Sequence, residues 1–163
     1  MTVAIVRYNA GNILSVKYAL QRLGIDAVIS DDPEILRNAD YVIFPGVGEA
    51  GSAMRYLQKM GLVEVLRQLT QPFLGICLGL QLMCHHSEEN DTDGLQIFNC
   101  LVKKFPPDDK VPHMGWNSLE NLKGPLFYGI PEENFVYYVH SYYADICEHS
   151  SALCRYILPF SAA

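Results

Sequence analysis

The sequence predicts an α/β fold in which a doubly wound, mostly parallel central sheet is followed by a β-rich C-terminal half. In residues 3–89, short apolar strands alternate with segments of helical periodicity, the order that builds parallel sheets. After residue 94, aromatic and β-branched stretches separated by turns replace that pattern. The 163 residues are 50% hydrophobic and 18% charged, which suits a packed core in a single domain, residues 1–163.

The first strand is predicted at residues 3–8, "VAIVRY", and a helix follows it. Asn12 can cap this helix and Gly24 can end it. Its apolar positions follow helical spacing: Ile13, Val16, Leu20 and Leu23. A second strand is predicted at residues 26–30 and a short helix at residues 33–39.

The third and fourth strands are predicted at residues 41–46, "YVIFPG", and 72–77, "PFLGIC". Their near-continuous apolar character is typical of strands that helices cover on both faces. Between them lies a helical region, about residues 50–69, interrupted near Gly61. Another helix is predicted at residues 78–89. In the C-terminal half, residues 95–105, 133–146 and 151–160 are predicted as strands, several of them antiparallel.

Charge and composition exclude several classes of function. The net charge of −6 disfavours nucleic acid or an anionic membrane as the main partner. We find neither a stretch long enough to span a membrane nor a secretion signal at the N-terminus. Five cysteines without a pairing pattern indicate reduced thiols in a cytoplasmic protein.

The most informative motif is Gly75-Ile76-Cys77-Leu78-Gly79, placed where a strand passes into a helix. A Gly-x-nucleophile-x-Gly turn at such a junction is a nucleophile elbow. The helix amide end should lower the thiol pKa, and the Leu78 amide would face an oxyanion. The alternative is that Cys77 is an inert core thiol.

A second glycine turn, Gly46-Val47-Gly48, ends the third strand and is flexible enough to offer amides to an anion. In an open α/β sheet, ligands bind beyond the carboxyl ends of the strands. Both turns should therefore face one crevice.

These turns resemble those of the triad-type, class I glutamine amidotransferases. Three further stretches, "YNAGN" (8–12), "KVPHMGWN" (110–117) and "YVHSYYA" (138–144), make the chain similar to the glutaminase subunits of imidazole glycerol phosphate synthases in histidine biosynthesis. The resemblance runs from the first strand to residue 163. It is the reason to expect a class I glutamine amidotransferase-like fold.

The resemblance implies that Cys77 attacks the side-chain amide of glutamine, which gives glutamate and ammonia. The ammonia would pass to a separate cyclase subunit, a (β/α)₈ barrel, within a heterodimer. Asn12, Met114 and Trp116 would meet that partner, although Trp116 could instead be a core anchor. No metal or organic cofactor is implied. The residues implied in glutamine binding are Gly46, Val47, Gly48, Leu78, Gln81, His140, Ser141 and Tyr142.

The same family supplies a base and an acid from a late His-Pro-Glu motif, which these 163 residues do not contain. The family pattern would continue for roughly thirty residues past "YILPFSAA". We therefore expect a domain truncated at its C-terminus, without its last elements and inactive as it stands. His85 and His86 should lie on the solvated end of the helix after Cys77. His113 and His140 are interpreted as hydrogen-bonded structural histidines.

Two other functions remain open. The missing base is compatible with a non-catalytic binding subunit of the same fold. A different elbow-cysteine hydrolase, such as a small peptidase or deglycase, would require a base within these residues. The adjacent His85 and His86 do not indicate a metal site, because no second ligand cluster has zinc-like spacing.

Overall fold

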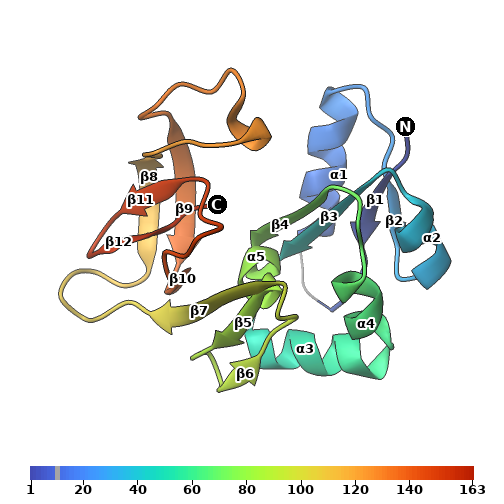
Figure 1. The fold of residues 1–163 in the computed structure, drawn as a ribbon, viewed down its shortest axis with the longest axis horizontal. Coiled ribbons are helices and arrows are strands. Elements are labelled where there is room, and N and C mark those ends of the chain that lie inside the picture. The colour runs from blue at the N-terminus through green and yellow to red at the C-terminus, as the bar shows by residue number, and fades with distance from the viewer. Residues whose placement is uncertain (10–11) are drawn as a thin grey trace.

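The N-terminal half is a parallel four-stranded sheet in the order β2-β1-β3-β4 (Figure 1). The computed structural model describes residues 1–9 and 12–163. All three strand pairs run parallel, as the alternating pattern predicts. The strands are β1 (Val3–Val6), β2 (Val28–Ser30), β3 (Tyr41–Gly46) and β4 (Phe73–Cys77).

Helices cover both faces of this sheet, because side chains of β1 alternate between two cores. Val3 and Ile5 pack with α1 (Ile13–Arg22), whereas Ala4 and Val6 belong to the larger core on the other face. Four helices build that larger core: α2 (Pro33–Asn38), α3 (Ala50–Lys59), α4 (Leu62–Arg67) and α5 (Leu78–Met83). The predicted doubly wound arrangement is confirmed.

Glycines mark the ends of two helices as the sequence predicts, whereas the expected cap of α1 is absent. Gly24 takes a φ of 76° after α1, and Gly61, at 67°, separates α3 from α4. Asn12 precedes α1 but does not cap it, because its backbone is left-handed and its side chain makes no capping hydrogen bond. Asp32 is a true cap: its carboxylate accepts the Glu34 amide at the start of α2. No helix of the described residues is both long and apolar enough to cross a bilayer.

The predicted helix at 78–89 is wrong in its second half. α5 ends at Met83, and residues Cys84–Ser87 form strand β5. β5 pairs parallel with β7 (Phe98–Lys104) and antiparallel with β6 (Thr92–Asp93). This non-local pairing overrides the local helical pattern. His85 and His86 consequently lie on a strand and not on a solvated helix end.

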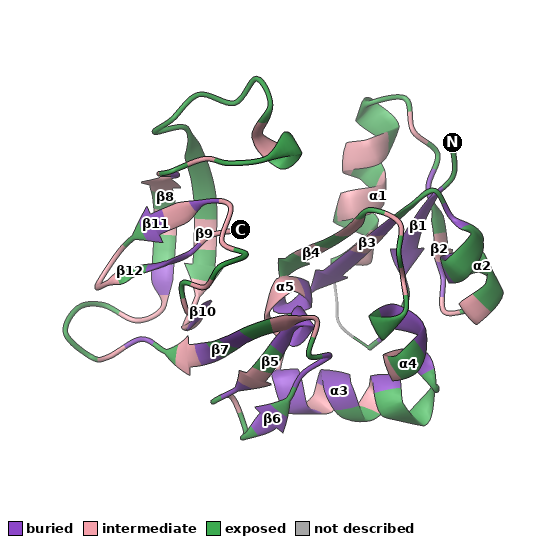
Figure 2. Ribbon diagram, in the orientation of Figure 1, coloured by how far each residue is buried: buried purple, intermediate pink, exposed green. Residues whose placement is uncertain are grey.

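The C-terminal half contains a mixed sheet in the order β11-β12-β10-β7-β5-β6 and a separate hairpin. The expected antiparallel pairing is present between β10 (Tyr142–Ala144), β12 (Pro159–Ser161) and their neighbours, and β11 (Leu153–Arg155) completes the edge. The hairpin joins β8 (His113–Ser118), which the sequence analysis did not assign, to β9 (Phe135–His140). A short 3-10 helix, η1 (Pro125–Phe127), lies between them. Figure 2 shows that much of the hairpin surface is exposed.

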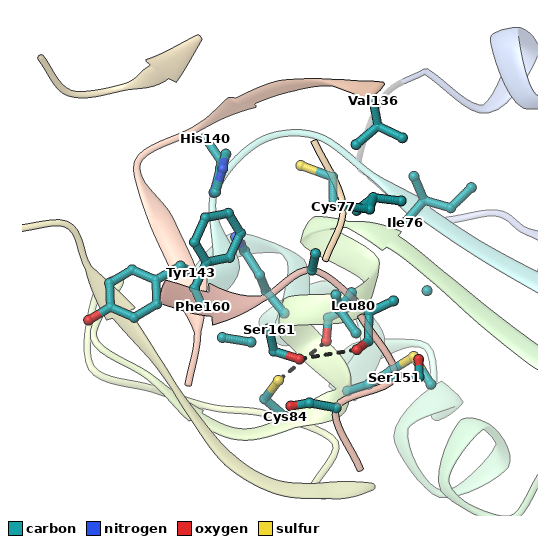
Figure 3. A pocket seen from close by; sticks show the side chains of 18 of the residues that line it. Ile76, Cys77, Leu80, Cys84, Val136, His140, Tyr143, Ser151, Phe160 and Ser161 are labelled. Atoms are coloured by element: carbon teal, nitrogen blue, oxygen red, sulfur yellow. Dashed lines mark hydrogen bonds between the residues drawn. The ribbon is translucent and has the colours of Figure 1, made fainter. Parts of the chain in front are cut away.

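A cavity of about 620 Å³ separates the two halves. On one side it is lined by β4 and α5, and on the other by β9, β10 and the C-terminal residues. Leu74 and Ile76 of β4 point into it and remain more than a third exposed. Cys77 and His140 lie on the wall of this cavity from opposite halves (Figure 3).

Candidate active site

Cys77 stands at the junction of β4 and α5 in a backbone conformation that few non-glycine residues adopt. Its φ is 54° and its ψ is −114°, and it directly precedes the first helical residue, Leu78. Such a conformation costs on the order of 1–3 kcal/mol and persists only where surrounding structure imposes it. The sharp turn leaves Cys77 exposed at the cavity while Leu78 is buried beneath it. This is the geometry of a nucleophile elbow.

Glycines are required around Cys77 because neighbouring atoms leave no room for a Cβ at these positions. A Cβ at Gly79 would overlap the carbonyl oxygen of Phe44 on β3, and one at Gly75 would lie 2.6 Å from the Met83 sulfur. A Cβ at Gly46 would overlap the Tyr8 hydroxyl. The start of α5 therefore lies directly against the end of β3, and no side chain fits between them.

The Gly46–Gly48 turn lies beside the nucleophile because Gly46 pairs in register with Cys77. Val47 is exposed, and Gly48 takes a φ of 122°, which favours glycine. Buried Tyr8 fixes this turn from below, since its hydroxyl donates to the Pro45 carbonyl oxygen at 2.7 Å. Tyr8 belongs to the "YNAGN" stretch, but its supporting role was not predicted.

The pKa of the Cys77 thiol is raised, contrary to the expectation from its helix position. Although Cys77 as a residue is exposed at the cavity, the protein atoms around its sulfur remove much of its hydration; this is the main cause, and the Glu89 carboxylate adds to it. The Leu78 amide lowers the pKa, but not enough to reverse the shift. α5 has only six residues, so its dipole is short and cannot offset the loss of hydration. The resting thiol is therefore protonated at neutral pH.

A continuous chain of hydrogen bonds lies across the cavity from Cys77. Gln81 on α5 donates its side-chain amide to the Tyr142 carbonyl oxygen at 2.9 Å. His140 Nδ1 contacts the same oxygen at 2.8 Å, and His113 Nδ1 lies 2.9 Å from His140 Nε2. The Asn117 amide closes the chain at His113 Nε2, at 3.3 Å.

The partners in this chain determine the tautomers of both histidines. A carbonyl oxygen only accepts, so His140 carries its proton on Nδ1 and uses Nε2 as an acceptor. His113 Nδ1 must then donate to His140, which leaves His113 Nε2 to accept from Asn117. Both rings are thereby neutral with all nitrogens bonded. Neither histidine keeps a free lone pair for a cysteine proton.

Burial reinforces the neutral state of this pair. It lowers the pKa of His113 to about 4, with a further contribution from His140, and also lowers the pKa of His140. The His113 ring is enclosed between two tyrosine rings, with centroids 4.7 Å from Tyr138 and 4.0 Å from Tyr156. His113 and His140 are thus hydrogen-bonded structural histidines, as the sequence analysis interpreted them.

Some of the residues expected to bind glutamine line the cavity, and others do not. Cys77, Gln81, His140 and Tyr142 line the cavity. Leu78, Ser141 and the Gly46–Gly48 turn do not line it. The two glycine turns are adjacent through the Gly46–Cys77 pairing, and of the two only the elbow lines this cavity.

The residues expected at a partner interface are exposed. Met114 and Trp116 are 58% and 69% exposed on the outer face of the β8–β9 hairpin. A core role for Trp116 is therefore excluded. Asn12 is exposed and follows β1 at the edge where Cys77 ends β4. The neighbouring Ala10 and Gly11 of "YNAGN" lie outside the described residues.

Comparison with known proteins shows which family the chain belongs to. Residues 5–154 match the family of class I glutamine amidotransferases. The chain belongs to the class I glutamine amidotransferase family. This assignment agrees with the geometry of the elbow, in which a cysteine with positive φ lies between two close-packed glycines at the carboxyl edge of a parallel sheet. It makes the chain a member of an enzyme family.

Named relatives and solved structures agree with this class I amidotransferase assignment. The chain is 58% identical, over all of its length and 85% of the relative's, to imidazole glycerol phosphate synthase subunit HisH of Bacteroides thetaiotaomicron. It is 43% identical to the HisH subunit of Pasteurella multocida, over 98% of this chain and 82% of that one. A crystal structure of a glutamine amidotransferase shares the fold with a TM-score of 0.73 at 18% identity, covering 95% of this chain and 85% of that one.

Proposed function

We propose that this chain is the glutaminase subunit of an imidazole glycerol phosphate synthase, acting on glutamine in histidine biosynthesis. The Cys77 elbow is the observation that carries the proposal, because its glycine contacts hold one thiol at the cavity. The relatives named as HisH subunits of imidazole glycerol phosphate synthase support the assignment to this synthase, and the class I glutamine amidotransferase family supports glutamine as the substrate. We place the protein in the cytoplasm, in keeping with five free thiols.

In the proposed reaction, the Cys77 sulfur attacks the carbonyl carbon of the glutamine side-chain amide. Ammonia leaves, and water hydrolyses the glutamyl thioester to release glutamate. Amides of Leu78 and of the Gly46–Gly48 turn would stabilise the oxyanion. Gln81 and the His140-Ser141-Tyr142 segment would hold the substrate. No metal or organic cofactor takes part in these steps.

The resting state of the site limits this chemistry. The Cys77 thiol has a raised pKa, and His113 and His140 are fully bonded to each other and to their neighbours. Without a general base the rate falls by about two to four orders of magnitude. We therefore propose that the 163-residue chain binds glutamine but hydrolyses it very slowly. The same observations favour, as a second candidate, a non-catalytic glutamine-binding subunit.

One labelling experiment addresses the site directly. A chloroketone analogue of glutamine, added in substoichiometric amounts at neutral pH, should alkylate Cys77 before the other four cysteines. Cys77 is exposed, whereas Cys84, Cys100 and Cys154 are buried. Excess glutamine should slow the labelling of Cys77, while partly exposed Cys147 serves as the internal control. Labelling of Cys77 that glutamine does not slow would contradict both candidate functions.

A turnover assay separates the two candidates. Glutamate release should be measured for the chain alone and with a matching cyclase subunit, each beside a Cys77→Ala variant. Slow release that requires Cys77 supports the glutaminase. Glutamine binding measured by calorimetry with no release above the variant supports the binding subunit.

We further propose that the outer face of the β8–β9 hairpin meets a cyclase subunit in a heterodimer. Side chains of alternate positions share this face because Met114 pairs with Val139 and Trp116 with Tyr137. These four residues and Phe135 are each more than half exposed. An exposed apolar face of this kind, rich in aromatic and methionine side chains, suits a protein interface.

The only tryptophan provides the readout for this interface. Addition of the cyclase subunit should shift Trp116 fluorescence to shorter wavelength, and Trp116→Ala or Met114→Ala should weaken association by at least tenfold. Tyr128→Ala is the matched control, since Tyr128 is 82% exposed outside the hairpin strands. Equal loss of association in the Tyr128 variant would overturn the assignment.

Asn12 is the third proposed contact with the partner. Because its φ is 71°, Asn12→Ala combines loss of the side chain with backbone strain, whereas Asn12→Gly removes the side chain alone. Both variants should weaken association equally, while the free energy of unfolding of Asn12→Gly should equal that of the original chain. Full association in the glycine variant would exclude Asn12 from the interface.

A further inference from the structure

A second group of thiols lies at the opposite end of α5 from Cys77. Cys84 is the first residue of β5, directly after the helix, and Cys100 lies on the neighbouring strand β7. Their sulfur atoms are 3.3 Å apart. Cys147 packs against the same cluster, which brings three thiols together. In the part of the chain that the structure describes, no set of three His, Cys, Asp or Glu side chains is arranged to hold a metal.

The cluster can be reached by a small solute. Cys84, Cys100 and Cys147 all line the 620 Å³ cavity that Cys77 also lines. Cys84 is fully buried and Cys100 keeps 8% of its surface. A small solute in the cavity can therefore meet Cys100 and the partly exposed Cys147, whereas Cys84 is reached only through Cys100. Figure 3 shows Cys84 at the cavity wall, with its sulfur near the Leu80 carbonyl oxygen.

We propose that Cys84 and Cys100 form an oxidation site at which hydrogen peroxide produces an intramolecular disulfide. A disulfide requires its sulfurs about 2.05 Å apart, so the pair must close by little more than 1 Å. The two residues lie on adjacent hydrogen-bonded strands, which keeps them near each other in the folded chain. This proposal concerns thiol chemistry alone and does not depend on glutamine hydrolysis.

The reaction balances in two steps. The Cys100 thiolate attacks one oxygen of hydrogen peroxide, the O–O bond breaks, and the departing hydroxide takes a proton to become water. The Cys84 sulfur then attacks the sulfur of the resulting sulfenic acid and loses its proton as a second water leaves. Two thiols have then lost two electrons, and one peroxide has been reduced to two waters.

The environment assigns different roles to the two thiols. In the resting pair, the Cys100 thiol donates to the Cys84 sulfur, and the Cys84 thiol donates to the Leu80 carbonyl oxygen. Once Cys100 is ionised, the Cys84 thiol can turn its hydrogen toward the Cys100 thiolate, which lowers the pKa of Cys100, and Cys147 contributes in the same direction. The same interaction raises the pKa of Cys84. The nearby Asp145 carboxylate opposes ionisation of Cys100, but Lys103 pairs with it at 2.6 Å. Cys100 keeps some exposed surface, whereas Cys84 has none, so Cys100 is the attacking thiol and Cys84 the resolving one.

The expected disulfide joins the end of the helix that starts at Cys77 to the strand that pairs with β10. Gln81 of this helix already bonds to Tyr142 of β10. Oxidation would thus add a covalent bond between β5, which directly follows α5, and β7 of the same sheet. Oxidation of the thiol cluster would therefore change the bonding at the end of α5, the helix that begins directly after Cys77.

Peptide mapping tests the proposal in a Cys77→Ser background, which removes the exposed thiol from competition. The folded chain is treated with one equivalent of hydrogen peroxide, and the remaining thiols are blocked. Trypsin and a glutamate-specific protease cut after Arg67, at Glu88 or Glu89, and after Lys103, which separates Cys84 from Cys100. Free thiols should fall from four to two per chain, and the two peptides should be joined until they are reduced.

Single variants decide between the possible pairs. Cys100→Ser should abolish the crosslink, whereas Cys154→Ser, which removes a fully buried thiol of a separate cluster, should leave it unchanged. Cys147→Ser should slow the reaction without preventing it. A Cys100–Cys147 link in place of the expected one, or oxidation of Cys100 to sulfinic acid without any crosslink, would overturn the proposal.

Discussion

The two walls of the cavity hold their functional residues by different means. On the β4–α5 wall, the backbone sets the position of Cys77, because α5 packs against β3 with glycines at the points of contact. On the opposite wall, side-chain hydrogen bonds set the positions of His140 and His113. Where α5 contacts β3 directly, there is no space for an added side-chain atom. Where hydrogen bonds between side chains hold a residue, a substitution is tolerated better, but the stability of the arrangement depends on pH.

The largest effect is expected from Gly79→Ala. Alanine favours a helix over glycine by about 1 kcal/mol, so helix propensity alone predicts stabilisation. The new Cβ would instead overlap the Phe44 carbonyl oxygen, and relieving that overlap should cost about 3 kcal/mol or more. Urea unfolding measures the difference. The matched control is Gly61→Ala, where nothing lies within 4 Å and only a positive φ opposes the change. Equal losses in both variants would show that close approach does not fix the elbow.

The histidines of the opposite wall should make the free energy of unfolding smaller in acid. Burial lowers the folded-state pKa of His113 from its ordinary 6.5 to about 4, so the unfolded chain binds the proton more readily between these values. The contribution of neutral His113 is therefore fully present above about pH 6.5 and is lost as the pH falls toward 4. His140, whose pKa is also lowered, acts in the same direction.

Replacement of His113 isolates this contribution from that of the carboxyl groups. In His113→Gln, the free energy of unfolding should depend less steeply on pH between 6.5 and 4, even though the variant is weaker at pH 7. His85→Gln, at an exposed position, should keep the slope of the original chain. Denaturation series at several pH values provide the measurement. An unchanged slope in the His113 variant would mean that the pKa of His113 is the same in the folded and the unfolded chain.

A smaller effect is expected from Tyr8→Phe. This change removes the hydroxyl that donates to the Pro45 carbonyl oxygen and should lower stability by about 1–2 kcal/mol. It should also loosen the Gly46–Gly48 turn, so hydrogen exchange at these amides should become faster. Tyr18→Phe, at an exposed position of α1, is the control. Unchanged exchange at the turn would show that the Tyr8 hydroxyl does not support it.

The smallest effect on folding is expected from Trp116→Ala. Because Trp116 is 69% exposed, its loss should change the free energy of unfolding by no more than about 0.5 kcal/mol. Phe160→Ala, at a 2% exposed position, should cost about 3–5 kcal/mol. Thermal unfolding of the two variants compares them. A large loss for Trp116→Ala would place this side chain in the core and weaken its assignment to the partner surface.

The local sequence was sufficient to predict the N-terminal half. Apolar strands, helical spacing and the glycines near residues 24 and 61 are short-range signals, and parallel βα units bring consecutive elements together. The elbow was predictable for the same reason, since Gly75, Cys77 and Gly79 lie within five residues. The fold class, four parallel strands and the position of Cys77 at the carboxyl edge followed from these patterns.

Other features were decided only by tertiary structure. α5 stops at Met83 because β7, distant in sequence, pairs with the residues that follow. The pKa of Cys77 is raised because burial, which no motif encodes, outweighs a short helix dipole. The bonding of His113 to His140 requires β8 and β9 to pair across a loop that the sequence did not reveal. A motif of a few adjacent residues determines the local backbone geometry, as at Cys77. Burial and the pairing of distant strands determine the protonation state and the hydrogen-bond partners of side chains such as Cys77 and His113.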